Sequence, residues 1–367
     1  MKVPFVDLKA QYLSIKPQLD AAIQEIIDTT AFIGGKPVSD FESSFAELYG
    51  VKHCISVANG TDSLYILMKM LGIGPGDEVI TVANSWISSS ETISQTGAKP
   101  VFVDIHFDFY SLDESLLEAK ITAHTKAIIP VHLHGQSCNM AKIMDISAKH
   151  NIPIIEDCAQ SHFSEFKGKR VGTFGVAGSF SFYPGKNLGA YGDAGCIITN
   201  DDELAAKCKM YARHGALKKH QHVLEGINSR MDGIQAAILS VKLPYILNWT
   251  DLRIKAADLY DTYLSDISGI MTPVRRNETK HTFHLYVIRT NKRDALAEFL
   301  KSKGIETTIH YPTALPNLPA YAYLGHEPTD FPIASAYQDQ ILSLPIYPEI
   351  SEEMIAYVAE SIREFFI

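Results

Sequence analysis

The sequence predicts an α/β protein with a large, mostly parallel-sheet domain and a smaller C-terminal α+β domain. Three observations support this fold class. Short apolar runs alternate with helical patterns over the first two thirds, the runs are apolar throughout, and the pattern changes near residue 240. Continuous apolar strands are typical of parallel sheets that helices cover on both faces. We therefore expect a large domain at 1–240 and a small domain at 241–367.

Seven runs in the first two thirds have the length and β-branched content of buried strands. They lie at residues 54–58, 78–82, 100–105, 127–133, 152–157, 179–183 and 196–200. Helical patterns at 62–71 and 140–150 separate some of these runs. The last two runs follow each other too closely for a long helix, which predicts that one edge of the sheet is mixed.

The C-terminal third has a different pattern. Residues 231–249 form a long helical pattern, and Pro244 is expected to break it. The elements expected beyond it are a strand at 284–290, a helix at 293–304, a short strand at 306–311 and a helix from about residue 351.

Composition excludes several classes of protein. The chain has 367 residues, 46% of them apolar, and a formal net charge of −9, which argues against general charge-driven binding to nucleic acid or to an anionic membrane. Its five cysteines form no CxxC pair, which favours free thiols in a reducing compartment. No secretory leader and no apolar run of about 18 residues is evident, so we expect a cytoplasmic protein.

Two predicted strand ends carry residues that suit a ligand, because open parallel sheets bind ligands beyond the carboxyl ends of their strands. Gly60 and Thr61 follow the strand at 54–58 and begin a helix, whose free N–H groups attract a phosphate. A simple N-cap with a turn glycine explains the same residues. Trp86 follows the strand at 78–82, where it could either stack on a flat ligand or pack against the protein.

Two further strand ends carry a carboxylate and an amine. Asp157 ends the run at 152–157, where a buried carboxylate requires a positive partner or serves as a cap. Ser181 and Lys186 lie in FSFYPGKNLGAYGDAG (180–195), whose glycines let the backbone approach a ligand closely. A phosphate cradle, a stacking ring, a carboxylate and a lysine at one sheet edge together fit pyridoxal phosphate, a flat phosphorylated aldehyde.

Each residue has a distinct role in this hypothesis. Lys186 would form a Schiff base with the cofactor and later move a proton, while Asp157 would keep the pyridine nitrogen protonated. Trp86 would cover one face of the ring. The residues that would hold the phosphate are Gly60, Thr61 and Ser181. A P-loop lysine is the competing interpretation of Lys186, but Asn187 stands where the pattern GxxxxGK[ST] requires a hydroxyl residue.

Several segments resemble, in order and spacing, the aminotransferases of nucleotide-linked keto sugars known as the DegT/StrS type. They are VANGTDSLYI, PIIEDCAQSH, GTFGVAGSFSFYPGKNLGAYGDAGCIITND and GINSRMDGIQAAIL. The resemblance extends over nearly the whole chain. It implies the type I fold of pyridoxal-phosphate-dependent transferases, L-glutamate as amino donor, and a homodimer with shared active sites.

The resemblance also assigns roles to single residues. It makes Lys186 the cofactor-linked lysine and Asp157 the partner of the pyridine nitrogen, and it places Gln160 against the ring hydroxyl of the cofactor. Asn228 resembles the asparagine that reaches the phosphate from the partner subunit. The residues it implies for substrate binding are Tyr183, His222 and His310.

The resemblance also implies a substrate class. NSWISSSETISQTGAKPVFVDI and SRMDGIQAAIL resemble enzymes that make 3-amino-3,6-dideoxyhexoses on dTDP, as in O-antigen biosynthesis, more than enzymes that act at C4. A 4-aminotransferase, a pyridoxal-phosphate-dependent sugar dehydratase and a regulatory protein remain as alternatives. Related dehydratases replace the lysine by histidine, which Lys186 argues against. The segment at 310–316 lacks the second histidine of the HYPxPLH pattern frequent in the family, so a role from that position does not carry over.

Five histidines also suggest a metal site. They are His132, His134, His214, His220 and His222. An HxH pair on a strand would place both rings on one face, but no cysteine or carboxylate completes a recognisable zinc set. We therefore expect no catalytic metal.

Overall fold

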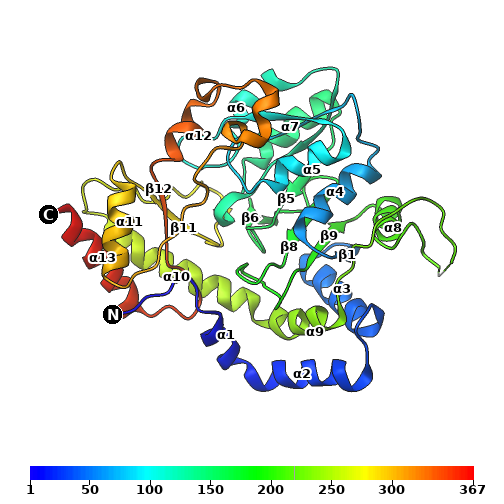
Figure 1. Ribbon diagram of the computed structural model, residues 1–367, viewed down its shortest axis with the longest axis horizontal. Coiled ribbons are helices and arrows are strands. Elements are labelled where there is room, and N and C mark those ends of the chain that lie inside the picture. Colours follow the sequence, from blue (N-terminus) through cyan, green and yellow to red (C-terminus); the bar gives the residue numbers. More distant parts are fainter. Residues whose placement is uncertain (219) are drawn as a thin grey trace.

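The computed structural model describes residues 1–218 and 220–367, with a twisted sheet at its centre (Figure 1). Four strands follow the order β1-β9-β8-β5 and three follow the order β3-β2-β4. Their bounds are β1 His53–Val57, β2 Glu78–Val82, β3 Lys99–Val103, β4 Thr125–Ile129, β5 Ile155–Asp157, β8 Ala177–Ser181 and β9 Gly195–Thr199. Single bridges from Ile128 to Ile154 and from Val131 to Asp157 join the two parts.

The sheet is parallel except at β9. Strand β2 pairs in parallel with β3 and β4, and β5 pairs in parallel with β8. Strand β9 runs antiparallel to both β8 and β1. All seven predicted strands are present and the mixed edge is confirmed. The run at 127–133 ends early as a strand because Pro130 has no N–H to donate to the ladder.

Helices cover both faces of the sheet, as continuous apolar strands require. The neighbours Cys54 and Ile55 on β1 illustrate this, because they enter two different buried clusters. The cluster of Ile55 includes side chains from α4 and α8, and that of Cys54 includes side chains from α3 and α9. The helices of this part are α1 Leu8–Ser14, α2 Lys16–Thr29, α3 Gly35–Tyr49, α4 Gly60–Met70, α5 Ser88–Thr96, α6 Glu114–Leu117, α7 Met140–His150 and α8 Asp202–Tyr211.

The long helical pattern near residue 240 is interrupted as predicted. Helix α9 (Gly233–Lys242) is followed by a 3₁₀ turn at Leu243–Tyr245, which contains Pro244, and then by α10 (Ile246–Leu264). Proline is tolerated in this turn because the N–H that it lacks would have no partner there, whereas inside a helix the missing N–H would break a hydrogen bond. The remaining elements are β6 Glu165–Phe166, β7 Lys169–Arg170, β10 Thr279–Lys280, β11 Tyr286–Arg289, α11 Arg293–Ser302, α12 Pro332–Tyr337, β12 Ile341–Leu344 and α13 Glu352–Phe366.

The prediction of a strand at 306–311 is wrong. Strand β11 pairs with β12, and the predicted segment contributes only a single bridge from Thr308 to Ser343. Pro312, which cannot donate to a ladder, follows the segment directly. Its apolar residues instead pack on the cores, as Ile309 does.

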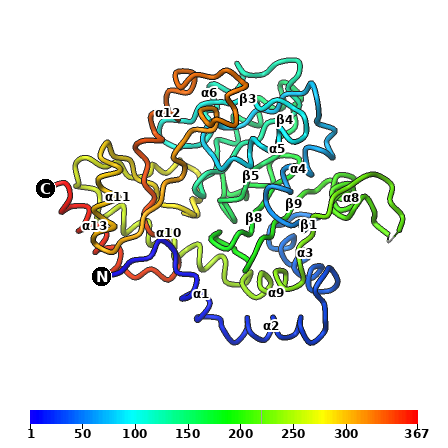
Figure 2. Tube along the Cα trace, viewed as in Figure 1, coloured from blue at the N-terminus to red at the C-terminus, as the bar shows by residue number. Residues whose placement is uncertain are grey.

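Contacts join the parts of the chain before and after residue 240 at more than one place. Val3 pairs with Ile305, and both termini lie on the same side of the molecule beside α11 and α13 (Figure 2). Helix α12 packs on the first part of the chain, because Asp104 accepts hydrogen bonds from the N–H groups of Ile333 and Ala334 in its first turn. The division into domains at residue 240 stays a prediction. Among the described residues, no helix is long and apolar enough to cross a membrane.

Candidate active site

The predicted phosphate cradle forms at the N-terminus of α4. A Cβ atom on Gly60 would lie 2.7 Å from the Cβ of Ser181, so only glycine lets this helix end and the end of β8 lie so close. The hydroxyl of Thr61 lies 2.7 Å from that of Ser88, the first residue of α5. Three hydroxyls therefore gather around a helix N-terminus, which favours a bound anion through its dipole and free N–H groups.

Asp157 is buried at the end of β5, and both of its carboxylate oxygens accept hydrogen bonds. The N–H of Ala159 donates to one oxygen at 3.1 Å and the hydroxyl of Ser89 donates to the other at 2.9 Å. Burial raises the pKa of Asp157, while these hydrogen bonds and the charge of Lys186 oppose that rise. The structure thus brings the predicted carboxylate and lysine into one electrostatic environment.

Lys186 is a half-buried amine on the loop after β8. Burial lowers the pKa of Lys186 to about 8, although the charge of Asp157 acts in the opposite direction. About a tenth of such an amine is neutral at pH 7, far more than for an ordinary surface lysine. Lys186 is therefore able to act as a nucleophile and to exchange protons.

Gln160 and Trp86 meet Tyr311, a contact that the sequence did not reveal. The amide of Gln160 donates to the hydroxyl of Tyr311 at 2.9 Å and accepts from the N–H of His134 at 2.7 Å. The ring of Trp86 lies 5.8 Å from that of Tyr311 and is 59% exposed. The Asp157 carboxylate acts on Tyr311, so Tyr311 connects the exposed indole to the side of the site that holds Asp157.

The other predicted residues divide into two groups. His310 bonds to Ser343 at 2.9 Å, and burial together with the charge of Lys186 lowers the pKa of His310 to about 4, so it lies near the lysine. Tyr183 is 59% exposed on the same loop as Lys186. The second group is Asn228, which accepts from Arg230 at 2.9 Å, and His222, which bonds to the carbonyl of His214 at 2.7 Å.

His222 and the Asn228 partner Arg230 border a depression of about 490 Å³ on the surface. Its lining includes His222, Arg230, Arg213 and Lys218, but neither Lys186 nor Asp157. Within the described residues, the hydrogen bonds of Asn228 and His222 do not extend to the Lys186 site. The hydrogen bonds of Asn228 and His222 therefore stay within their own segment, although the neighbouring Ser229 accepts from the N–H of Ala58 at 3.1 Å, two residues before Gly60.

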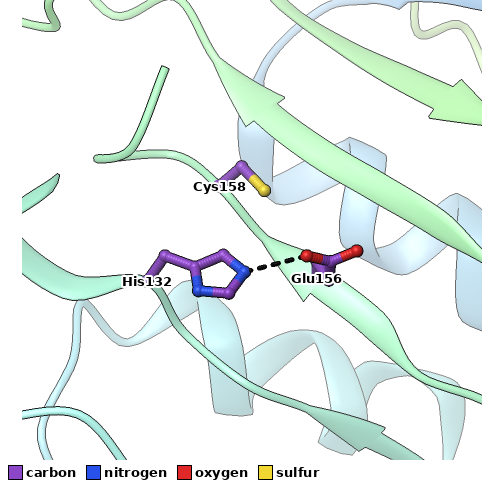
Figure 3. A group of neighbouring side chains, drawn as sticks. All are labelled: His132, Glu156 and Cys158. Atoms are coloured by element: carbon purple, nitrogen blue, oxygen red, sulfur yellow. Dashed lines mark hydrogen bonds and ion pairs between the residues drawn. The ribbon is translucent and has the colours of Figure 1, made fainter. Parts of the chain in front are cut away.

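A buried group of His132, Glu156 and Cys158 has the spacing of a metal site, with its possible donor atoms within 4.8 Å of one another (Figure 3). The expectation that no carboxylate or cysteine joins the histidines is therefore wrong for His132, because β5 brings Glu156 and Cys158 beside it. The atoms of His132 and Glu156 are already engaged, however. Glu156 accepts from His132 at 3.0 Å and from the N–H groups of the loop at 172–175 at 2.6 to 2.8 Å. The Nδ1 atom of His132 accepts from the N–H of Cys138. These bonds identify Glu156 as the centre of a structural polar network.

We expect Glu156→Gln to destabilise the fold by about 2 to 4 kcal/mol. The new amide would present an NH₂ group to donors that now share two carboxylate oxygens, leaving at least one buried N–H without an acceptor. Equilibrium urea unfolding measures the effect, with the exposed Glu298→Gln as the matched control. Equal stabilities of the two variants would contradict the structural role of Glu156.

The residues present fit pyridoxal phosphate. The tight approach of Gly60 to Ser181, the adjacent hydroxyls and the buried carboxylate near an amine correspond to its phosphate, ring nitrogen and aldehyde. Pyridoxal phosphate, when bound, supplies an aldehyde that joins reversibly to amines and a ring that withdraws electrons. Asp157 would hold the proton of the ring nitrogen, and Lys186 would bind covalently and transfer protons.

A mostly parallel sheet, a phosphate cradle, a buried carboxylate and the Lys186 amine on the loop after β8 together match a pyridoxal-phosphate-dependent enzyme of the type I fold. Residues 13–363 match the DegT/DnrJ/EryC1/StrS aminotransferase family. The chain is 41% identical over 363 residues to the dTDP-3-amino-3,6-dideoxy-alpha-D-galactopyranose transaminase of Aneurinibacillus thermoaerophilus, with 99% of each chain covered. It is 44% identical over 368 residues to a Geobacillus stearothermophilus protein named a pleiotropic regulatory protein, covering 100% of this chain and 99% of that one.

The solved structures agree with this assignment. DesV of S. venezuelae, in complex with a ketimine intermediate, superposes with a TM-score of 0.97 at 39% identity, covering 99% of this chain and 98% of that chain. The chain belongs to the DegT/DnrJ/EryC1/StrS aminotransferase family. The predicted fold class, cofactor and enzyme class are thereby confirmed.

Proposed function

We propose that this protein transfers the amino group of L-glutamate to C3 of a dTDP-linked 3-keto-6-deoxyhexose, giving the 3-amino-3,6-dideoxy sugar and 2-oxoglutarate. The observation that carries the reaction type is the half-buried Lys186 amine, with its lowered pKa, beside the buried carboxylate of Asp157. The name of the A. thermoaerophilus relative supports both the dTDP carrier and position C3. Use of the product in a surface polysaccharide such as an O-antigen is part of this proposal.

A substrate panel tests this proposal. The purified protein is incubated with ¹⁵N-labelled glutamate and with dTDP-linked 3-keto, dTDP-linked 4-keto or UDP-linked 3-keto sugars, and products are identified by mass spectrometry and NMR. We expect ¹⁵N at C3 of the dTDP sugar and stoichiometric 2-oxoglutarate. Label at C4 would contradict the proposed position, and a preference for the UDP sugar would contradict the proposed carrier. Dehydration without label would contradict the proposed reaction.

A regulatory protein is the second candidate, because the G. stearothermophilus relative bears that name. The two functions differ in their response to glutamate alone. An aminotransferase should lose the absorbance of its lysine-bound cofactor and release one 2-oxoglutarate per site. A regulator without turnover should show neither change.

We also propose a homodimer with composite active sites, working in the cytoplasm. Exposed apolar side chains near the 490 Å³ depression support the dimer, since such patches mark interfaces. They are Phe32, Ile33, Leu217 and Val223. Asn228 is exposed, and its side-chain hydrogen bond goes to Arg230 of its own segment, which leaves the residue accessible to the site of a partner subunit. The five free, buried cysteines support a reducing compartment.

Mixing two inactive variants tests the composite site. In a two-fold dimer the exchange of residues is mutual. A hybrid of Lys186→Ala and Asn228→Ala chains would therefore have one site with both defects and one site with neither. We expect the activity of the mixture to rise well above that of either parent, toward about a quarter of wild type when chains exchange at random.

Chain exchange is verified separately with differently tagged subunits. Asn228→Ala must also be defective alone. Verified hybrids without any gain in activity would show that Asn228 serves its own chain or no site. A fully active monomer would contradict the dimer itself.

A further inference from the structure

The loop that carries Lys186 closes tightly on itself. The N–H of Lys186 donates to the carbonyl of Tyr183 at 2.8 Å. At the other end of the loop, a Cβ on Gly189 would lie 2.2 Å from the carbonyl oxygen of Pro184, so the chain can pass there only as glycine. Because Gly189 contacts Pro184 in this way, a displacement of Gly189 would shift the backbone that orients Lys186.

Helix α9 holds this loop through two side chains. The carbonyl of Gln235 accepts from the N–H of Tyr191 at 2.8 Å, and the ammonium of Lys242 donates to the carbonyl of Gly189 at 2.7 Å. Gln235 and Lys242 are seven residues apart, which places them on the same face of a helix. The two contacts are therefore made by one rigid element.

Lys242 is an unusual residue for a core. Its side chain is fully buried, and within the described residues its ammonium group forms no ion pair, since Glu349 acts on it only through charge. Burial lowers the pKa of Lys242 to about 8, and the charge of Glu349 opposes this only partly. The ring of Tyr191 lies 4.2 Å from the ammonium and offers a cation–π contact. Packing alone would favour methionine or leucine at such a position.

We propose that Lys242, with Gln235, is a positioning residue that fixes the orientation of Lys186 by holding the loop at Gly189 and Tyr191. The inference rests on the proposed role of Lys186 as the reactive amine. An apolar side chain would serve stability at position 242 as well as the buried ammonium does. The hydrogen bond to Gly189 is the contact that an apolar side chain could not make. A loop held in this way keeps the amine in the geometry that reaction with an aldehyde demands.

Lys242→Met tests this inference through a reaction that needs no sugar substrate. Free pyridoxal phosphate is added to the cofactor-free dimer, and the absorbance band of the lysine-bound cofactor is followed as the amine and aldehyde condense with loss of water. Borohydride reduction and peptide mapping then locate the linkage at Lys186. We expect capture by Lys242→Met to be at least about tenfold slower than by wild type.

Steady-state kinetics and stability separate positioning from a merely structural role. We expect kcat to fall at least about tenfold while KM for glutamate stays within about threefold, because the binding groups are intact. The unfolding midpoint of the cofactor-free protein should stay within about 4 °C of wild type, since relief of a buried charge offsets the loss of the donor to Gly189. Lys255→Met, at an exposed position of α10, is the matched control.

Wild-type capture and kcat in a folded Lys242→Met protein would overturn the inference, whatever its unfolding midpoint. If Lys242→Met does not fold, Gln235→Ala is used instead, because it removes the second contact between α9 and the loop. We expect Gln235→Ala to slow capture in the same assay. Capture by Gln235→Ala at the wild-type rate would then overturn the inference. A wild-type capture rate in Lys186→Ala would instead refute the assignment of the reactive lysine. Failure of the sugar panel alone leaves the capture result unaffected.

Discussion

Lys186→Ala is expected to abolish turnover, with a rate below about 10⁻³ of wild type. The variant loses the covalent anchor of the cofactor and the group that transfers protons. Alanine cannot replace an amine whose pKa burial has lowered to about 8. The release of 2-oxoglutarate from glutamate, followed with a coupled assay, measures the loss.

Cofactor binding provides an independent measurement for the same variant. The α4 N-terminus and the hydroxyls of Thr61 and Ser181 remain, so we expect Lys186→Ala to retain pyridoxal phosphate without a covalent link. Borohydride should then fix no cofactor to the chain. Lys126→Ala, an exposed substitution on β4, is the control for protein handling. A near wild-type rate in the folded Lys186→Ala variant would show that another group performs this chemistry.

The sequence predicted the part of the site that one topological rule determines. Asp157 ends β5 and Lys186 follows β8, and these strands are parallel neighbours, so their carboxyl ends meet at one edge. Gly60 joins them because β1 returns to the same sheet and α4 begins at that edge. In a parallel sheet, the residues at the carboxyl ends of the strands can therefore be grouped from the sequence alone.

Other parts of the site depend on contacts that no local pattern specifies. Gln160 and Tyr311 are bonded although 151 residues separate them, and Tyr311 belongs to the segment that was wrongly predicted as a strand. Ser89, which donates to Asp157, had a weak signal, because it lies in a run of three serines just after Trp86 at the end of β2. By its position in the sequence, Lys242 is an ordinary basic residue in the last turn of α9, which would be expected to face solvent. Only the packing of α9 in the structure shows that this lysine is buried.

Asp157→Asn is expected to lower kcat by at least about 10²-fold while leaving most of the fold intact. The amide is nearly isosteric with the carboxylate and can still accept from Ser89 or Ala159. A neutral group, however, cannot hold a proton on the ring nitrogen of the cofactor as a carboxylate does, so charge developed on the substrate carbon is less stabilised. Single-turnover deamination of glutamate measures this step directly.

The pH dependence of cofactor capture supplies a second readout for Asp157→Asn. Burial lowers the pKa of Lys186 to about 8, and the negative charge of Asp157 opposes that shift by favouring the ammonium form. Removing this charge should lower the pKa of Lys186 further, so that capture, which requires the neutral amine, reaches its plateau at a lower pH than in wild type. Asp145→Asn, at an exposed position of α7, should leave the profile unchanged. Full activity and an unshifted profile in Asp157→Asn would place Asp157 among the structural caps, because a carboxylate that acts on the ring nitrogen and on Lys186 must affect both measurements.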